Sequence, residues 1–247
     1  MRMAGLLEVC ADSVCSAVNA ARGGADRIEL CSALPLGGLS PDEDLFCMVR
    51  ERVDIPVRVL LRPRAGDFLY DEDEFELLCC QAARFAGLGA DGIVIGMLNP
   101  DGTLDAERMS ALMTCGDGCG VTLHRAFDVC RDAHEALRTA KELGVDTILT
   151  SGQLLRELVS ESGGGLRILI GGGVNADVIR ALAPQTGADA FHLSAKAAVP
   201  SGMEFRREAV PMGAAGMNEF ELWRCDEGAV RAAREALDAV CTARKEN

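Results

Sequence analysis

Short β-rich runs alternate with longer amphipathic segments along almost the whole chain. Strands that are joined by helices form right-handed crossovers, which place the strands in a parallel sheet. Eight such units in about 250 residues match the (β/α)8 TIM barrel, an α/β fold. We therefore expect a single domain over 1–247, with the barrel at about 6–196, a long loop at 197–226 and a C-terminal helix at about 227–243.

The boundaries of the expected elements follow from hydrophobic periodicity. Strands are predicted at 6–11, 27–32, 57–63, 92–98, 121–127, 147–151, 167–172 and 190–195. Helices are predicted at 12–22, 41–52, 72–87, 104–114, 132–143, 153–160, 175–183 and 227–243. A doubly wound open sheet is the competing fold, and its dinucleotide-binding form needs G-x-G-x-x-G after the first strand. The first turn here reads Cys10-Ala11-Asp12-Ser13, which disfavours that form.

A glycine followed closely by an aspartate precedes four of the predicted strands. The aspartates are Asp26, Asp91, Asp146 and Asp189. Glycine suits the end of a helix, and aspartate suits the turn into the next strand. We expect these residues to form a repeated loop on the stability face of the barrel, and we assign them no function.

Composition excludes several classes of function. A net charge of -13 disfavours both nucleic acid and an anionic membrane as partners. No apolar stretch approaches the length that spans a bilayer, and because only residues 1–4 precede the first predicted strand we expect no signal peptide. Eleven cysteines, an odd number, predict reduced thiols in the cytoplasm rather than a disulfide framework.

The first two predicted strands both end in Glu-x-Cys. Because side chains alternate along a strand, Glu8 shares a face with Cys10, and Glu29 shares a face with Cys31. Aliphatic residues fill the opposite face of each strand. Burying an unpaired ionised group costs several kcal/mol, roughly, so buried carboxylates tend to be paired, metal-bound or functional. These strands therefore predict a polar site inside the barrel.

Other predicted strands bring further polar side chains to the same mouth, because the C-terminal strand ends of a barrel converge there. The third strand carries Arg58, Arg62 and Arg64 on one face and is followed by Asp67. The fifth strand ends with His124, Arg125 and Asp128, of which His124 and Asp128 share a face. The eighth strand carries His192, Ser194 and Lys196 on one face. His134 falls in a predicted helix and is expected at the surface. Structural ion pairs explain single members of this set, whereas their convergence favours a functional pocket.

These residue types suit acid–base chemistry on a small anion. Glu29 or Glu8 is the candidate base, His124 its acid–base partner with Asp128 beside it, and Arg62 the anion clamp. Arg64 offers a second forked donor. Gly172 and Gly173 precede a helix whose N-terminus is predicted to bind an anion, and Ser151 adds a hydroxyl donor.

The thiols support a different hypothesis. Cys10 and Cys31 lie on adjacent predicted strands, and soft thiolates select Cu(I). Chance proximity is the alternative, because cysteine is commonly buried and this chain has eleven. A C-x3-C at Cys115 and Cys119 has no second pair in step with it, so it is weak support for zinc.

The combined motifs resemble the CutC family of copper homeostasis proteins. The matching strings are Arg22-Gly23-Gly24-Ala25-Asp26-Arg27-Ile28-Glu29-Leu30-Cys31, Gly37-Gly38-Leu39-Ser40-Pro41, Arg62-Pro63-Arg64, Gly66-Asp67-Phe68, His124-Arg125-Ala126-Phe127-Asp128, Ile148-Leu149-Thr150-Ser151-Gly152 and Gly171-Gly172-Gly173-Val174. The resemblance implies a cytoplasmic TIM barrel, often oligomeric, with a proposed role in copper trafficking or tolerance.

The same resemblance implies a set of pocket residues: Glu8, Glu29, Arg62, Asp67, His124, Arg125, Asp128 and His192. Ala65 and Leu193 depart from the family pattern, which has a second glycine and often a serine at these places. Neither departure disturbs the charged set.

Two functions remain open from the sequence. One is a homo-oligomeric Cu(I)-binding protein that uses Cys10 and Cys31. The other is an enzyme that acts on a small anionic, sugar-like or phosphorylated substrate. A third hypothesis, a scaffold that assembles through the barrel surface, has only the 197–226 loop in its favour.

Overall fold

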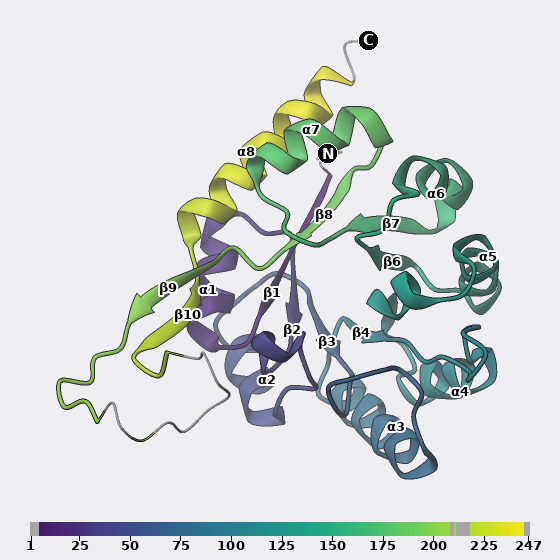
Figure 1. Ribbon diagram of the computed structural model, residues 1–247, viewed down its shortest axis with the longest axis horizontal. Coiled ribbons are helices and arrows are strands. Elements are labelled where there is room, and N and C mark those ends of the chain that lie inside the picture. Colours follow the sequence, from purple (N-terminus) through teal and green to yellow (C-terminus); the bar gives the residue numbers. More distant parts are fainter. Residues whose placement is uncertain (1–4, 208–209, 211–217, 245–247) are drawn as a thin grey trace.

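Eight parallel strands close into a barrel in the computed structural model, which describes residues 5–207, 210 and 218–244 (Figure 1). Each strand pairs with the next along the chain, and β8 pairs with β1. The strands are β1 Leu6–Ala11, β2 Arg27–Leu30, β3 Val57–Leu60, β4 Gly92–Ile95, β5 Gly120–Leu123, β6 Thr147–Thr150, β7 Arg167–Ile170 and β8 Ala190–Leu193. The predicted single-domain TIM barrel is confirmed.

Helices surround the barrel and follow the strands in alternation, and α7 packs beside α8 (Figure 1). They are α1 Val14–Gly23, α2 Glu43–Arg50, α3 Glu72–Gly87, α4 Ala106–Cys115, α5 Ala133–Leu143, α6 Leu155–Ser162, α7 Ala176–Thr186 and α8 Glu227–Ala243. Short 3-10 turns are η1 Leu34–Leu36, η2 Arg125–Val129 and η3 Gly163–Gly165. No helix of the described residues is both long and apolar enough to cross a membrane.

The main apolar core lies between the barrel and its helices. Leu7 and Val9 belong to it together with helix residues such as Ala17 and Phe46. Because faces alternate along a strand, the polar residues between them point into the barrel. Burying the apolar face accounts for strand formation, and the polar face is left to build the site.

Three of the recurring aspartates anchor the N-terminal ends of strands. The carboxylates of Asp26, Asp91 and Asp146 accept hydrogen bonds from backbone N–H groups at 2.8, 2.8 and 2.7 Å, respectively. The donors are residues at the start of β1, β3 and β5. These contacts match the structural role expected for the Gly–Asp loops.

The third strand ends earlier than predicted, and its arginines separate. Arg58 lies at the N-terminal end of the barrel, where its guanidinium binds both carboxylate oxygens of Asp146 at 2.8 and 3.0 Å. Its side chain fills the space that Gly92 and Gly120 leave: a Cβ on either glycine would lie within 2.8 Å of Arg58 atoms. Arg58 therefore does not reach the C-terminal mouth.

Two other segments correct the sequence prediction. β5 ends at Leu123, so His124 and Asp128 do not share a strand face; Asp128 lies on the η2 turn. The expected loop 197–226 contains an antiparallel hairpin of β9 Lys196–Pro200 and β10 Glu221–Cys225, which projects from the barrel (Figure 1). Pairing between the two strands stabilises the hairpin. Asn19 of α1 also donates a hydrogen bond to the backbone of Cys225 at 2.9 Å.

The remainder of that loop includes the predicted loop residues Pro211, Met212, Gly213, Gly216 and Met217, which lie outside the described residues.

Candidate functional site

A cavity of about 470 Å³ lies at the C-terminal ends of the barrel strands, the mouth that carries the active site in barrels of this kind. Most of the predicted site residues line it: Cys10, Glu29, Cys31, Arg62, His124, Arg125, Asp128, Gly172, Gly173 and His192. Strand parity placed Cys10, Glu29 and His192 on the inner faces of β1, β2 and β8, whereas Asp128 and the two glycines reach the cavity from turns that follow strands.

Four candidate site residues do not line the cavity, and neither does Lys196, which begins β9 rather than ending β8. Glu8 is completely buried beneath it. Arg64 turns toward α3, where its Nε lies 2.5 Å from Glu74, and exposed Asp67 pairs with Arg64 at 3.0 Å. Ser151 acts indirectly, because its hydroxyl donates to Asp128 at 2.8 Å.

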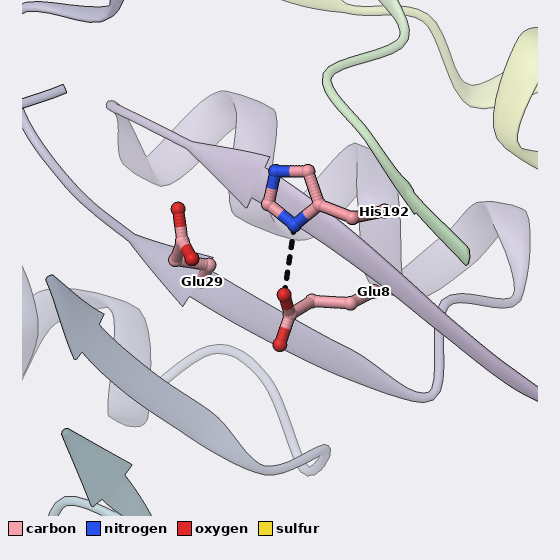
Figure 2. A group of neighbouring side chains, drawn as sticks. All are labelled: Glu8, Glu29 and His192. Carbon is pink, nitrogen blue, oxygen red and sulfur yellow. Dashed lines mark hydrogen bonds and ion pairs between the residues drawn. The ribbon is translucent and has the colours of Figure 1, made fainter. Parts of the chain in front are cut away.

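The floor of the cavity is a charged chain of three side chains. The Glu8 carboxylate accepts from Arg27 Nε at 2.5 Å through one oxygen, and its other oxygen lies 2.8 Å from His192 Nδ1 (Figure 2). Burial alone would raise the pKa of Glu8, but the charges and hydrogen bonds of Arg27 and His192 outweigh it and lower that pKa to about 2. Burial opposes the charged form of His192, yet neighbouring Cys10, Glu29 and Glu8 raise its pKa well above the usual value. Glu8 is thus an anion that holds a protonated His192.

Glu29 faces this pair from the adjacent strand β2 (Figure 2). It is 6% exposed, and no described residue bonds its Oε2. Burial, assisted by the negative charge of Glu8, raises the pKa of Glu29 to about 7 against the opposing charges of His192 and Arg27. A carboxyl group that titrates near neutrality is suited to both donating and accepting a proton.

Glu8, Glu29 and His192 are also close enough to share a cation, because one ligand atom from each lies within 4.8 Å of the others. Within the described ranges this is the only such group of three or more His, Cys, Asp or Glu side chains. Neither Cys10 nor Cys31 belongs to it.

His124 is held as a neutral ring. Its Nδ1 accepts a hydrogen bond from the backbone N–H of Ala126 at 3.1 Å, so the ring proton resides on Nε2. This nitrogen is buried and has no partner among the described residues. Burial, together with the nearby charge of Arg62, lowers the pKa of His124 to about 3. The ring packs on Phe68 with centroids 4.9 Å apart. His124 can therefore donate one hydrogen bond, but it does not act as a charged group.

Arg62 shapes the rim of the cavity. Its terminal nitrogens donate to the backbone carbonyls of Leu36 and Gly38 at 3.2 Å and of Gly66 at 2.8 Å. The guanidinium also lies 5.1 Å from the centre of the Phe68 ring. Its Nε is buried without a partner. The positive charge of Arg62 thus faces the cavity while most of its donors hold two loops in place.

Asp128 is fixed by the neighbouring strand β6. Its carboxylate accepts from Thr150 at 2.6 Å and from the backbone and side chain of Ser151, and it pairs with Arg125 at 2.8 Å. Burial opposes ionisation, but these hydrogen bonds prevail and lower the pKa of Asp128. Asp128 is an ionised, fully bonded residue.

The glycine run after β7 presents backbone donors to the cavity. Gly172 and Gly173 have φ angles of +85° and +71°, which side-chain-bearing residues rarely adopt. Among the described residues, no acceptor takes the N–H of either glycine. Asn175 caps the following helix α7 with its own side chain at 3.0 Å. The free donors available to an anion are therefore those of the glycines.

The two thiols line the cavity and bond to the backbone. Cys10 donates to the carbonyl of Leu193 at 3.7 Å, and Cys31 donates to that of Ala11 at 3.6 Å. Burial, with the nearby Cys10 and Glu29, raises the pKa of Cys31 well above its usual value. Copper binding at Cys31 would have to overcome this preference for the protonated thiol.

Arg27 is the functional residue that sequence reasoning missed. It precedes Glu29 by two positions in β2 and so shares its face, a parity signal that could have identified it as the partner of a buried carboxylate. Phe68 was seen only as part of a matching string.

A closed (β/α)8 barrel with a polar cavity at its C-terminal mouth defines the class of this protein. The CutC family model matches residues 5–197, and the chain belongs to the CutC family.

Relatives extend this assignment across most of the chain. A family protein CutC of Bacteroides fragilis (strain YCH46) is 44% identical over 218 residues, covering 84% of this chain and 87% of the relative. The human copper homeostasis protein cutC homolog is 42% identical over 236 residues, 92% of this chain and 86% of the relative.

Solved structures agree with the fold. The crystal structure of a Streptococcus agalactiae protein named as copper homeostasis protein CutC matches with a TM-score of 0.73 and 26% identity, covering 77% of this chain and 98% of that one. A thiamine phosphate pyrophosphorylase from Pyrococcus furiosus, at 18% identity and a TM-score of 0.56, covers 95% of this chain and 96% of its own. The latter shares only the fold.

Proposed function

We propose that the cavity binds a small anionic, sugar-like or phosphorylated molecule and that Glu29 transfers a proton to or from it. The observation that carries this proposal is the position of Glu29: a buried carboxyl group on the cavity floor, one oxygen of which has no hydrogen-bond partner in the part of the chain that the structure describes. A pKa of about 7 supports it, since a proton-transfer group works best near the ambient pH.

The charges around the cavity favour an anion. Glu8 balances Arg27, and Asp128 balances Arg125. Among the described residues that line the cavity, only Glu29 then opposes the positive charges of Arg62 and His192, and its raised pKa keeps it partly protonated at neutral pH. The unused N–H groups of Gly172 and Gly173 add hydrogen-bond donors on the same wall.

The roles within the site follow from these states. Glu29 is the acid–base residue, protonated His192 stabilises negative charge that develops on the bound molecule, and Glu8 holds that imidazole in place. His124 offers a neutral donor through Nε2.

Hydrogen exchange from a panel of small phosphorylated and carboxylated sugars tests the proposal. Each compound is incubated with the protein in D2O, and the loss of a carbon-bound proton signal is followed by NMR. We expect Glu29→Gln to slow exchange by at least about 10²-fold. The matched variant Glu76→Gln, at an exposed helix position, should exchange at the wild-type rate. Equal rates in wild type and Glu29→Gln, or no exchange with any compound, would contradict the proposal.

A second candidate function is Cu(I) binding by Cys10 and Cys31. The family relationship and the human relative's name favour it, and the donor set fits, because two buried thiols from adjacent strands line one cavity. In this role the two sulfurs would hold copper as cargo within a copper homeostasis process.

A Cu(I) titration in competition with a chelator tests this second function. We expect one tight site in wild type that a Cys10→Ser/Cys31→Ser variant loses and that Arg62→Ala retains. The control is Cys15→Ser/Cys80→Ser, which removes two exposed thiols. Weak uptake of several copper ions, changed equally by both double variants, would indicate adventitious thiol binding instead.

The cellular setting is also a proposal. All eleven cysteines are free, which favours a reducing compartment such as the cytoplasm.

Exposed Val199, Leu222 and Trp223 on the β9–β10 hairpin favour self-association. Sedimentation of wild type and Trp223→Ser tests the oligomer, and a wild type that stays monomeric at all concentrations would exclude it.

A further inference from the structure

A second cavity, of about 510 Å³, lies at the opposite, N-terminal end of the barrel. Arginines at the starts of three strands line it: Arg27 of β2, Arg58 of β3 and Arg167 of β7. We propose that this lower cavity binds a small phosphate-type oxyanion. Forked guanidinium donors match the geometry of such an ion, and their grouping stands out in a chain with a net charge of -13.

The terminal nitrogens of Arg27 are hydrogen-bond donors that its ion pair with Glu8 does not use. Arg27 is 7% exposed and bonds Glu8 through Nε alone. Within the part of the chain that the structure describes, neither of its terminal nitrogens has a hydrogen-bond partner, and Nη2 is fully buried. A buried donor without an acceptor is costly, so a bound oxyanion that supplies acceptors would be stabilising.

The remaining charges leave room for an anion. Asp146 is fully engaged, since it accepts from Arg58, from Thr147 and from the backbone of Val121. Asp189 is held only loosely, 3.7 Å from Arg167. Three arginines and two aspartates line the cavity, and Glu8 pairs with Arg27 from outside the lining, so these charges balance. An oxyanion would therefore bind through the unused terminal donors of Arg27 and through Arg167, which is the arginine most free to move onto a ligand.

The wall of this cavity includes Gly163, Gly164 and Gly165. At each of these positions, an added Cβ would meet no atom within 4 Å. Packing therefore does not require glycine here, in contrast to Gly92 and Gly120, where Arg58 fills the space. Three successive residues without side chains leave the backbone open to a ligand, as phosphate-binding loops require.

Arg27 also connects the two ends of the barrel. It lines the lower cavity, and its Nε reaches Glu8, which in turn bonds His192 of the upper cavity. An oxyanion that draws on Arg27 would change the hydrogen bond to Glu8 and, through it, the environment of the His192 ring. This inference stands independently of the function proposed for the upper cavity.

Titration with inorganic phosphate, followed by backbone ¹H–¹⁵N NMR of the whole protein, tests the proposal. We expect saturable shifts at residues 163–166, together with a shift of the His192 ring signals. Arg167→Ala should raise the Kd for phosphate about tenfold, as loss of one charge-assisted contact predicts. Arg156→Ala, which removes the same charge from an exposed position of α6, should leave the Kd unchanged. Arg27 is left intact, because its removal would strand Glu8 as an unpaired buried charge.

The location of the shifts separates this site from the upper one. Shifts confined to residues 171–174, or equal weakening by Arg167→Ala and Arg156→Ala, would overturn the lower site. Glu29→Gln should retain phosphate binding at 163–166 even if it abolishes all proton exchange. The two proposals therefore fail through different measurements.

Discussion

The two ends of the barrel both hold buried arginine but use it differently. At the lower end, Arg58 is fully paired with Asp146 and fills the barrel between two glycines. At the upper end, Arg62 donates its hydrogen bonds to loop carbonyls, and among the described residues none bonds Oε2 of Glu29. The satisfied Arg58–Asp146 pair stabilises the lower barrel, whereas the unsatisfied groups at the upper end remain available for a ligand. Buried charge can thus serve stability when it is paired and ligand binding when it is not.

Gly120→Ala tests the stabilising end and has the largest expected effect. The new Cβ would lie 2.5 Å from Arg58 Nη2 and 2.9 Å from Asp146, forcing this ion pair apart. We expect the free energy of unfolding to fall by about 3 kcal/mol in urea titrations. Gly164→Ala, where no atom lies within 4 Å, should change it by less than about 0.5 kcal/mol. Equal stability of the two variants would show that the Arg58 contact does not hold the lower barrel.

Glu29→Gln tests the unsatisfied end through its pH dependence. The unfolded chain loses the Glu29 proton near 4.5, whereas the folded protein keeps it until about pH 7. Folding stability therefore falls as pH rises between these values, and a glutamine removes this loss. The free energy of unfolding of Glu29→Gln minus that of wild type should therefore be larger at pH 8 than at pH 5, by on the order of 2 kcal/mol.

Urea titrations at both pH values measure this difference, with Glu76→Gln as the exposed control. Glu8 has the opposite sign, because its lowered pKa gives stability that is present above pH 4.5 and lost as pH falls toward 2. If Glu29→Gln follows wild type at both pH values, Glu29 does not carry the raised pKa.

Arg62→Lys tests the upper end by removing the forked guanidinium whose hydrogen bonds hold two loops at the rim of the cavity. One ammonium cannot replace donors to the carbonyls of Leu36, Gly38 and Gly66 at the same time. We expect amide hydrogen exchange at residues 36–39 to become about tenfold faster. Arg156→Lys should leave this exchange unchanged, and unchanged exchange in Arg62→Lys would mean that other contacts hold the loop.

The fold and the convergence of the pocket were predictable from local signals. Strand alternation reports which residues share a face, so Glu8, Glu29 and His192 could be placed inside the barrel before any contact was known. The alternation of strands and helices along the chain predicted the barrel, because strands joined by helices form a parallel sheet. Boundaries were less accurate, because β5 ends where the His124 side chain accepts from Ala126 and starts a 3-10 turn.

Partners that depend on loop conformation could not be predicted. The carbonyls that bind Arg62 are positioned by Gly37 and Gly38, both at positive φ. Arg64 leaves the mouth because the capping box of α3 places Glu74 beside it. Strand parity contains no information about either arrangement. Arg27, in contrast, lay within reach of the same parity argument that identified Glu29.

The three histidines give the smallest but most direct test, because each should titrate differently in ring ¹⁵N NMR spectra. Between pH 5 and 8 we expect His124 to stay neutral with its proton on Nε2, since burial lowers its pKa to about 3. Burial opposes the charged form of His192, but the groups around it raise its pKa, so we expect His192 to keep its proton to a higher pH than an ordinary imidazole. Half-exposed His134 should titrate above its usual value, because its hydrogen bond to Glu161 raises the pKa.

Glu161→Gln is the internal control for this experiment: it should lower the pKa of His134 and leave both barrel histidines unchanged. A His192 ring that loses its proton below pH 7 would contradict the charged floor on which the anion proposal depends. A titrating His124 would instead mean that water reaches the wall of the cavity. Either result would remove the distinction between the satisfied Arg58–Asp146 pair of the lower barrel and an upper mouth whose charges are set by burial.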